Sequence, residues 1–165
     1  MPNPDLYKGR EQTYVKHFVL KHYLERVAYN IFSFSSDFVY VDGFSGPWKS
    51  EAESYEDTSF KIAIDKLRAI RDGLKKDRNK DVKFRCLFVE KDKTAFLDLQ
   101  KSVEEIKDID IRLINGSFED NIPEICNFIG RSFSLVFIDP TGWTGFDLIK
   151  IAPLLMLKGE VLINF

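Results

Sequence analysis

The sequence has few of the residues on which metal and redox sites depend. Its only two cysteines, Cys86 and Cys126, have neither the spacing of a metal-ligand pair nor that of a redox pair. Its only two histidines, His17 and His22, both lie early in the chain. We therefore predict no metal site, and the cysteine usage fits a reduced intracellular compartment best.

Long apolar runs and an excess of one charge are also missing. No stretch approaches the roughly 20 apolar residues that cross a bilayer, and the polar start at residues 1–5 lacks the apolar core of a secretion signal. The 24 basic and 26 acidic side chains nearly cancel, so composition does not support nucleic acid or a membrane as a partner. We expect a cytoplasmic protein without a membrane-spanning segment.

The sequence does contain a regular alternation of two apolar patterns. A continuous apolar run at residues 38–41 and mainly apolar runs at 84–89, 111–114, 133–138 and 159–165 are typical of buried strands, with the weakest signal at 111–114. Helical spacing occupies residues 13–31, 63–74 with Thr58 or Ser59 as N-cap, 96–106, 118–129 and 148–155. This alternation predicts right-handed βαβ crossovers and an α/β fold of three layers, with a mostly parallel sheet between helices.

The length of 165 residues suits one domain over residues 1–165, with residues 1–35 as a helical extension. An apolar strand at residues 159–165 would leave an exposed edge, which invites association with another chain. We expect either that a longer protein continues past this strand or that a partner, such as a second copy, covers its edge.

Three of the predicted strands are followed directly by an acid: Asp42, Glu90 and Asp139. The carboxyl ends of parallel strands share one edge of the sheet, where such folds bind ligands. An acid can also end a strand simply because the chain leaves the core there, so a single strand-end acid does not indicate a binding site. Three together favour a site, and Glu90 ends the second strand, where nucleotide-binding folds hold ribose hydroxyls.

The turn after the first strand, residues 42–47, has two glycines, Gly43 and Gly46, that permit close approach of a ligand. It lacks the G-x-G-x-x-G pattern that cradles a pyrophosphate, which favours a nucleoside without phosphates over NAD. Ser45 is a poor hydrolase nucleophile because Pro47 breaks G-x-S-x-G and both histidines precede it. A nicotinamide-dependent oxidoreductase remains a rival interpretation.

Loop charges bear on the substrate class. The acidic stretch at residues 51–57 lies between a strand and a helix, hence on the site edge, where it would repel phosphates. The basic run at residues 75–80 connects a helix to a strand and so lies at the opposite edge. The chain therefore gives no support for a nucleic-acid substrate.

Five segments in a fixed order carry a resemblance that spans nearly the whole chain: T-Y-V-K-H at 13–17, Y-V-D-G-F-S-G-P at 40–47, F-V-E-K-D at 88–92, F-I-D-P at 137–140 and E-V-L-I-N-F at 160–165. With them the sequence resembles the three-Cys-motif partner protein family, TcmP. The resemblance implies a Rossmann-like fold of class I methyltransferases, strand order 3-2-1-4-5, S-adenosylmethionine as cofactor, a bacterial or archaeal origin and association with a protein that bears a three-cysteine motif.

The resemblance also assigns residues. It implies a cofactor loop at Asp42, Gly43, Phe44, Ser45 and Gly46, a ribose-binding acid at Glu90 next to Lys91, and an adenine-side segment at Ser117 and Phe118. Asp139 and Pro140 match the motif beside the transferable methyl group. Thr141 and Gly142 replace the second proline and the aromatic residue of the D-P-P-Y motif of amino-group methyltransferases. Trp48 stands where similar loops often have glycine. The resemblance therefore does not assign the atom that receives the methyl group.

Two functions follow as expectations. The first is a methyltransferase of unknown acceptor, in which Asp139 orients the nucleophile or takes its proton. The second is a non-catalytic module that keeps the fold to bind its three-cysteine partner. For Asp139 the alternative is that it only ends the fourth strand and holds the loop after it.

Overall fold

The computed structural model describes residues 7–9, 11–46, 57–140 and 148–164. The elements run in the order α1 (Glu11–Phe34), β1 (Asp37–Asp42), α2 (Ser59–Arg78), β2 (Lys83–Glu90), α3 (Lys93–Val103), β3 (Asp110–Asn115), the short 3-10 helix η2 (Glu119–Asn121), α4 (Ile122–Ile129), β4 (Phe133–Ile138), α5 (Ala152–Leu155) and β5 (Gly159–Ile163). They form two compact units: α1 and α2 belong to one, and the sheet with the remaining helices to the other.

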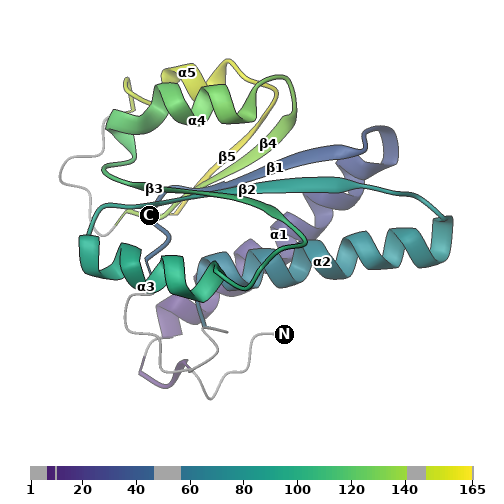
Figure 1. Cartoon of the computed structure of the whole chain (residues 1–165), viewed down its shortest axis with the longest axis horizontal. Coiled ribbons are helices and arrows are strands. Elements are labelled where there is room, and N and C mark those ends of the chain that lie inside the picture. The colour runs from purple at the N-terminus through teal and green to yellow at the C-terminus, as the bar shows by residue number, and fades with distance from the viewer. Residues whose placement is uncertain (1–6, 10, 47–56, 141–147, 165) are drawn as a thin grey trace. The chain divides into compact units, whose positions relative to one another are not determined.

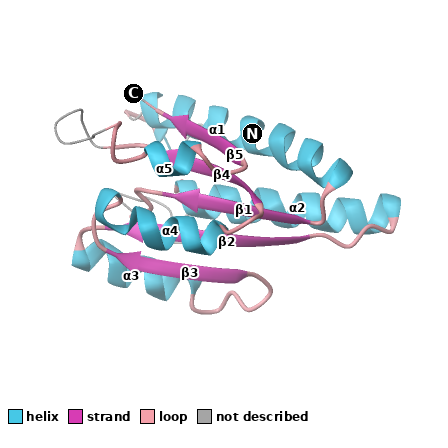
Figure 2. Cartoon of the chain, turned by 90° about the horizontal axis from the view of Figure 1, so that it is seen from above, coloured by secondary structure: helices cyan, strands magenta, loops and turns pink. Residues whose placement is uncertain are grey.

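The five strands form one sheet in the order β3-β2-β1-β4-β5, and Figure 2 shows all five pointing the same way. In the parallel register, Asp42 at the end of β1 lies opposite Phe137 of β4, and Glu90 at the end of β2 lies opposite Asn115 of β3. This confirms the predicted α/β fold and its strand order. From β1 the strands β2 and β3 extend the sheet toward one edge, and β4 and β5 extend it toward the other, so β1 and β4 are neighbours.

The first unit consists of two long helices that lie side by side. α2 carries apolar residues at helical spacing, with Phe60, Leu67 and Leu74 buried on one face. Lys66 of α2 forms an ion pair with Glu25 of α1 at 2.9 Å. Lys80 donates to the backbone carbonyl of Phe32, so the C-terminal ends of the two helices are also tied together.

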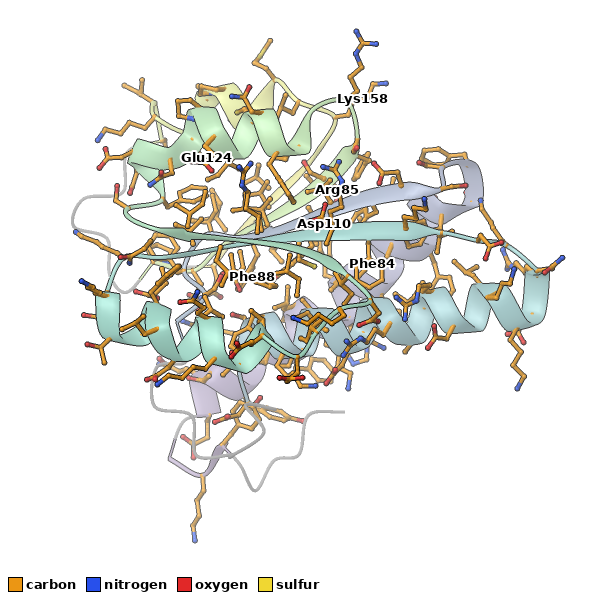
Figure 3. The ribbon with its side chains drawn as sticks, viewed as in Figure 1. Phe84, Arg85, Phe88, Asp110, Glu124 and Lys158 are labelled. Carbon is orange, nitrogen blue, oxygen red and sulfur yellow. The ribbon has the colours of Figure 1, made fainter. Side chains whose placement is uncertain are left out.

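In the second unit the helices cover both faces of the sheet: α4 and α5 lie on one face and α3 on the other (Figure 1). The α4 face holds a core cluster to which the central strands contribute Val39 and Val41, Leu87 and Val89, and Val136 and Ile138. Successive side chains of a strand point to opposite faces. In Figure 3, Arg85 accordingly points toward the α4 side while its neighbour Phe84 and Phe88 point away from it.

Several element boundaries differ from the predicted ones. Thr58 occupies the N-cap position of α2, but its side chain makes no capping hydrogen bond. α3 ends at Val103, so Ile106 lies in the following loop. The predicted helix at 148–155 is a turn followed by only four helical residues, Ala152–Leu155. No helix in the described part of the chain is both long and apolar enough to span a bilayer.

Candidate functional site

The structure places the three strand-end acids on neighbouring strands at one edge of the sheet. Asp42 is the last residue of β1, Glu90 is the last residue of β2, and Asp139 follows the last residue of β4. Because β2, β1 and β4 are adjacent and parallel, their carboxyl ends share an edge, with about 4.8 Å between neighbouring strands. The expected shared edge is therefore present.

The three acids also belong to the same face of the sheet. Each directly follows a residue of the α4-side core: Val41, Val89 and Ile138. Side-chain alternation therefore directs Asp42, Glu90 and, by continuation, Asp139 to the opposite face, the one covered by α3. Asp42 is 0% and Glu90 3% exposed, and Asp139 is half-buried. This edge thus holds a buried, acceptor-rich group of carboxyl side chains, which we call the acidic edge.

The loop that follows β1 is fixed by bonds to both neighbouring strands. The backbone N–H of Gly43 donates to Phe137 O of β4 and that of Ser45 to Val89 O of β2, both at 2.9 Å. Asp42 Oδ1 accepts from the Phe44 N–H at 3.0 Å. Ser45 is fully buried and its hydroxyl donates to Asp42 O at 2.8 Å. That bond gives Ser45 a structural role in the turn.

The space beside Gly43, expected to admit a ligand, is occupied by a side chain of the protein itself. A Cβ atom on Gly43 would lie 2.7 Å from Cδ2 of Phe118, closer than real contacts allow. Phe118 is 2% exposed, belongs to the core cluster and lies 6.0 Å from the ring of Phe44. Its predicted contact with an adenine stays a prediction. Next to it, the Ser117 hydroxyl donates to Asp120 Oδ2 at 2.7 Å.

Glu90 lies in a tight turn that leads into α3. Its Oε1 accepts from the backbone N–H of Asp92 at 2.6 Å, and Asp92 in turn caps α3 by accepting from the Ala95 N–H at 2.8 Å. The backbone carbonyl of Glu90 accepts from the side-chain amide of Asn115 at 2.9 Å. Lys91, between the two acids, is exposed. One carboxylate oxygen of Glu90 therefore shapes the turn.

Asp139 is held by a residue from the next strand. The side-chain amide of Asn164 donates to Asp139 Oδ1 at 2.8 Å, and the backbone N–H of Asn164 donates to Ile138 O at 2.9 Å. The β4–β5 ladder thus continues one step past β5 and brings this amide to the carboxylate. Pro140 follows and is half-buried. Trp48, the acidic stretch up to residue 56, and Thr141 and Gly142 lie outside the described residues.

Sequence reasoning missed three polar residues at or near the acidic edge: Tyr40, Asn115 and Asn164. Asn115 and Asn164 each follow or end a strand as the acids do, so the same strand-end argument would have found them. Tyr40 gave no signal, because an aromatic residue in an apolar run is usually core. Burial raises the pKa of its hydroxyl well above the ordinary value, and the charges of Asp42, Cys86 and Asp139 raise it further.

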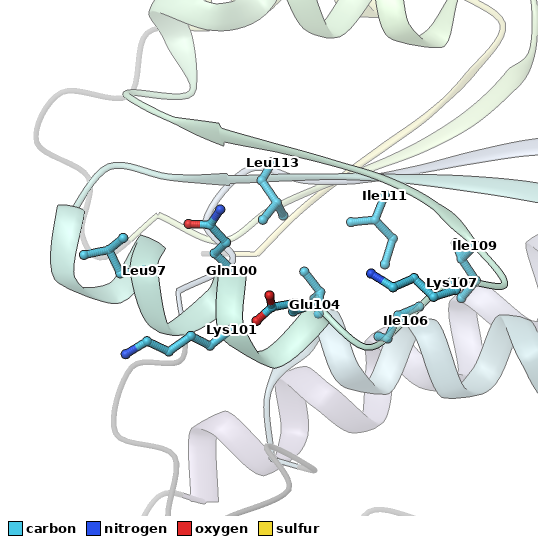
Figure 4. A pocket seen from close by; sticks show the side chains of 10 residues that line it. Leu97, Gln100, Lys101, Glu104, Ile106, Lys107, Ile109, Ile111 and Leu113 are labelled. Atoms are coloured by element: carbon cyan, nitrogen blue, oxygen red, sulfur yellow. The ribbon is translucent and has the colours of Figure 1, made fainter.

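A separate groove lies between α3 and β3 and has a volume of about 460 Å³. Figure 4 shows Ile111 and Leu113 of β3 on one side of it, and Gln100 and Lys101 of α3 with Glu104 just after that helix on the other. Its other lining residues are Leu97, Val103, Ile106, Lys107 and Ile109. Six of its ten lining residues are aliphatic, and the charged ones are Lys101, Glu104 and Lys107. Within the described residues, no cluster of three or more histidine, cysteine or acidic side chains could bind a metal ion.

The acidic edge is therefore the best-defined candidate site of the described chain. Its arrangement suits a ligand that donates hydrogen bonds and carries positive charge, because buried carboxylates need donors or cations. Comparisons with protein-family models, with curated proteins and with solved structures returned no match.

Proposed function

We propose that this chain binds S-adenosylmethionine at the acidic edge and acts as a methyltransferase. The observation that carries the proposal is the placement of Asp42, Glu90 and Asp139 on one face at the carboxyl ends of three adjacent parallel strands. In open α/β sheets, ligands bind at this edge, where the strand order reverses. The fold and the resemblance of the motifs support the same cofactor.

The residues of the chain suit the parts of this cofactor. Glu90 ends the second strand and would accept the ribose hydroxyls, while the loop from Asp42 to Gly46, with its fixed backbone, would face the amino-acid portion. The cofactor, when bound, supplies an activated methyl group. Asp139, held in one orientation by Asn164, would orient the acceptor nucleophile or take its proton.

A nicotinamide cofactor fits less well. A dinucleotide site needs glycines whose bare backbone faces the pyrophosphate. Here the missing Cβ of Gly43 accommodates the ring of Phe118. The acidic edge also contributes negative charge where a pyrophosphate would lie. We therefore place the nicotinamide-dependent oxidoreductase behind the methyltransferase.

The test is calorimetric titration of the purified protein with S-adenosylmethionine and, separately, with NAD. Saturable binding of S-adenosylmethionine supports the proposal. No binding to a folded protein favours the alternative, a non-catalytic module that associates with a three-cysteine-motif protein in the bacterial or archaeal cytoplasm. Preferential binding of NAD favours the oxidoreductase.

The Glu90→Gln substitution localises the binding site. Glutamine keeps one acceptor oxygen for the Asp92 N–H but replaces the other with a donor, so the variant should fold normally and bind S-adenosylmethionine about tenfold more weakly. Glu104→Gln is the matched control and should bind like the wild type, because Glu104 lines the α3–β3 groove, which includes none of the three acids. Equal affinity in both variants would place the ligand elsewhere.

Asp139→Asn tests the catalytic role. This variant keeps the acceptor oxygen that the Asn164 amide uses, so S-adenosylmethionine affinity should change less than twofold. The rate of methyl transfer to a working acceptor, measured as the release of S-adenosylhomocysteine, should fall by about 10²–10⁴-fold because a proton acceptor is lost. Unchanged turnover would assign Asp139 to the structure of the loop alone.

A further inference from the structure

A fully buried hydroxyl group without a hydrogen-bond partner lies directly behind the acidic edge. Tyr40 of β1 is 0% exposed, and its Oη atom has no hydrogen-bond partner in the structure. Buried polar groups in native proteins are nearly always satisfied, and an exception points to a ligand or an ordered water. The described residues provide neither a donor nor an acceptor for this hydroxyl.

Strand geometry places Tyr40 on the same face as the acids. It precedes Asp42 by two residues, so both side chains point away from the core that holds Val39 and Val41. In the register with β4, Tyr40 lies opposite Leu135 and Asp42 opposite Phe137, and Asp139 follows two residues later on that strand. Tyr40 and Asp42 are both 0% exposed, so both side chains are shielded from solvent.

The position of Tyr40 also indicates which end of a ligand it would meet. Asp42 and Asp139, on β1 and β4, are both close enough to raise the pKa of the Tyr40 hydroxyl electrostatically, after burial as the main cause. Glu90, the predicted ribose acid, lies on the other side of β1, at the end of β2. The Asp42 carboxyl group and the Tyr40 phenol oxygen, both on β1, provide acceptors for a group that only donates and is positively charged, which describes an ammonium group.

We propose that Tyr40 is a further ligand-contacting residue, whose hydroxyl oxygen, together with Asp42, binds the α-ammonium group on the methionine side of the cofactor. This inference rests on the proposed function. It divides the cofactor contacts of the acidic edge into a ribose half at Glu90 and an ammonium half at Tyr40 and Asp42, and leaves Asp139 to the acceptor.

The test is Tyr40→Phe, which removes only the hydroxyl group. Calorimetry would compare three ligands: S-adenosylmethionine, S-adenosylhomocysteine, which keeps the ammonium group, and 5′-methylthioadenosine, which lacks the amino-acid portion. We expect about tenfold weaker binding of the first two and an unchanged affinity for the third. The melting temperature of the ligand-free variant should be equal to or higher than that of the wild type, because an unsatisfied buried group has been removed.

Tyr29→Phe is the matched control, since Tyr29 lies on α1 with its side chain 42% exposed. It should leave all three affinities and the melting temperature unchanged. Affinities for S-adenosylmethionine that agree within twofold between Tyr40→Phe and the wild type would overturn the inference and leave the proposed function standing. Equal weakening for 5′-methylthioadenosine, or a lower melting temperature, would also overturn it. A wild-type protein that binds no S-adenosylmethionine would remove both proposals together.

Discussion

At the acidic edge, individual polar atoms have structural roles as well as the proposed ligand roles. Asp42 Oδ1 fixes the loop through the Phe44 N–H, and Glu90 Oε1 fixes the turn into α3 through the Asp92 N–H. Replacing either acid with alanine would therefore disturb the backbone as well as the site. Amide replacements keep an acceptor oxygen and separate these two effects.

The buried phenol of Tyr40 predicts an alkaline stability effect that needs no ligand. Burial, reinforced by Asp42, raises its pKa well above 10.0 in the folded protein, while the unfolded chain releases the proton near pH 10. Above that pH the unfolded state binds fewer protons, so the free energy of unfolding falls as pH rises through the raised pKa, by up to about 1.4 kcal/mol per pH unit from this group. Below pH 10 the full contribution is present.

Urea unfolding of the wild type and Tyr40→Phe between pH 8 and pH 11.5 measures this effect. The variant should lose less stability than the wild type above pH 10, and Tyr29→Phe, which removes the same group from an exposed side chain, is the control. Parallel curves for the wild type and Tyr40→Phe would mean that this phenol ionises as easily in the folded protein as in the unfolded chain.

At the scale of elements, the surroundings of Gly159 exclude a side chain, whereas those of Gly73 would accept one. Gly159 begins β5 opposite Ser134, and a Cβ atom there would lie 2.3 Å from the Ser134 carbonyl oxygen. Gly73 lies inside α2, and a Cβ atom there would meet only the Tyr29 hydroxyl, at 3.7 Å. The first position needs glycine to bring two strands together, and the second does not.

Alanine at these two positions should therefore change stability in opposite directions. Gly159→Ala forces the β4–β5 backbones apart and should lower the free energy of unfolding by about 1–3 kcal/mol. Gly73→Ala should raise it by about 0.5–1 kcal/mol, because alanine loses less backbone entropy in a helix. Thermal and urea unfolding of the two variants side by side would check both signs, and a stabilised Gly159→Ala would contradict the strand register.

The predicted elements were recovered where the apolar pattern reports burial directly. β1, β2 and β4 are buried along almost their whole length, and their continuous apolar runs predicted them within one or two residues. β3 lies at an edge of the sheet and is partly exposed, which explains its weaker apolar signal. Helix C-terminal ends were less predictable, because an apolar residue can keep helical spacing beyond the last helical turn, as Ile106 does after the end of α3 at Val103.

At the scale of the whole molecule, the sheet edge formed by β5 is the expected place for self-association. In the described structure β5 pairs with β4 alone, and its residues Val161, Leu162 and Ile163 are only half-buried. The segment before it exposes Leu148, Ile149, Leu155 and Met156, the last at 86%. Unpaired edges and exposed apolar side chains both favour pairing, so we predict that two copies of these 165 residues associate through this surface unless a further segment of the protein covers it.

Sedimentation velocity tests this proposal over a range of protein concentrations. The wild type should show a concentration-dependent dimer, and the double substitution Ile149→Glu with Met156→Glu should weaken dimerisation at least tenfold by placing charge in the interface. Val15→Glu with Val19→Glu is the control, because these exposed residues lie on α1. A wild type that stays monomeric at high concentration would exclude association of two copies.

The sequence by itself determined the alternation of strands and helices, the parallel sheet and the three acids at strand ends. These features depend on burial and side-chain periodicity, which follow from the order of neighbouring residues. Tertiary structure alone decided which distant side chains meet at this edge: Asn164 reaches Asp139 from another strand, and Phe118 fills the space beside Gly43. Such contacts join residues that are distant in the chain, and local apolar patterns contain no information about which distant side chain will fill a given space.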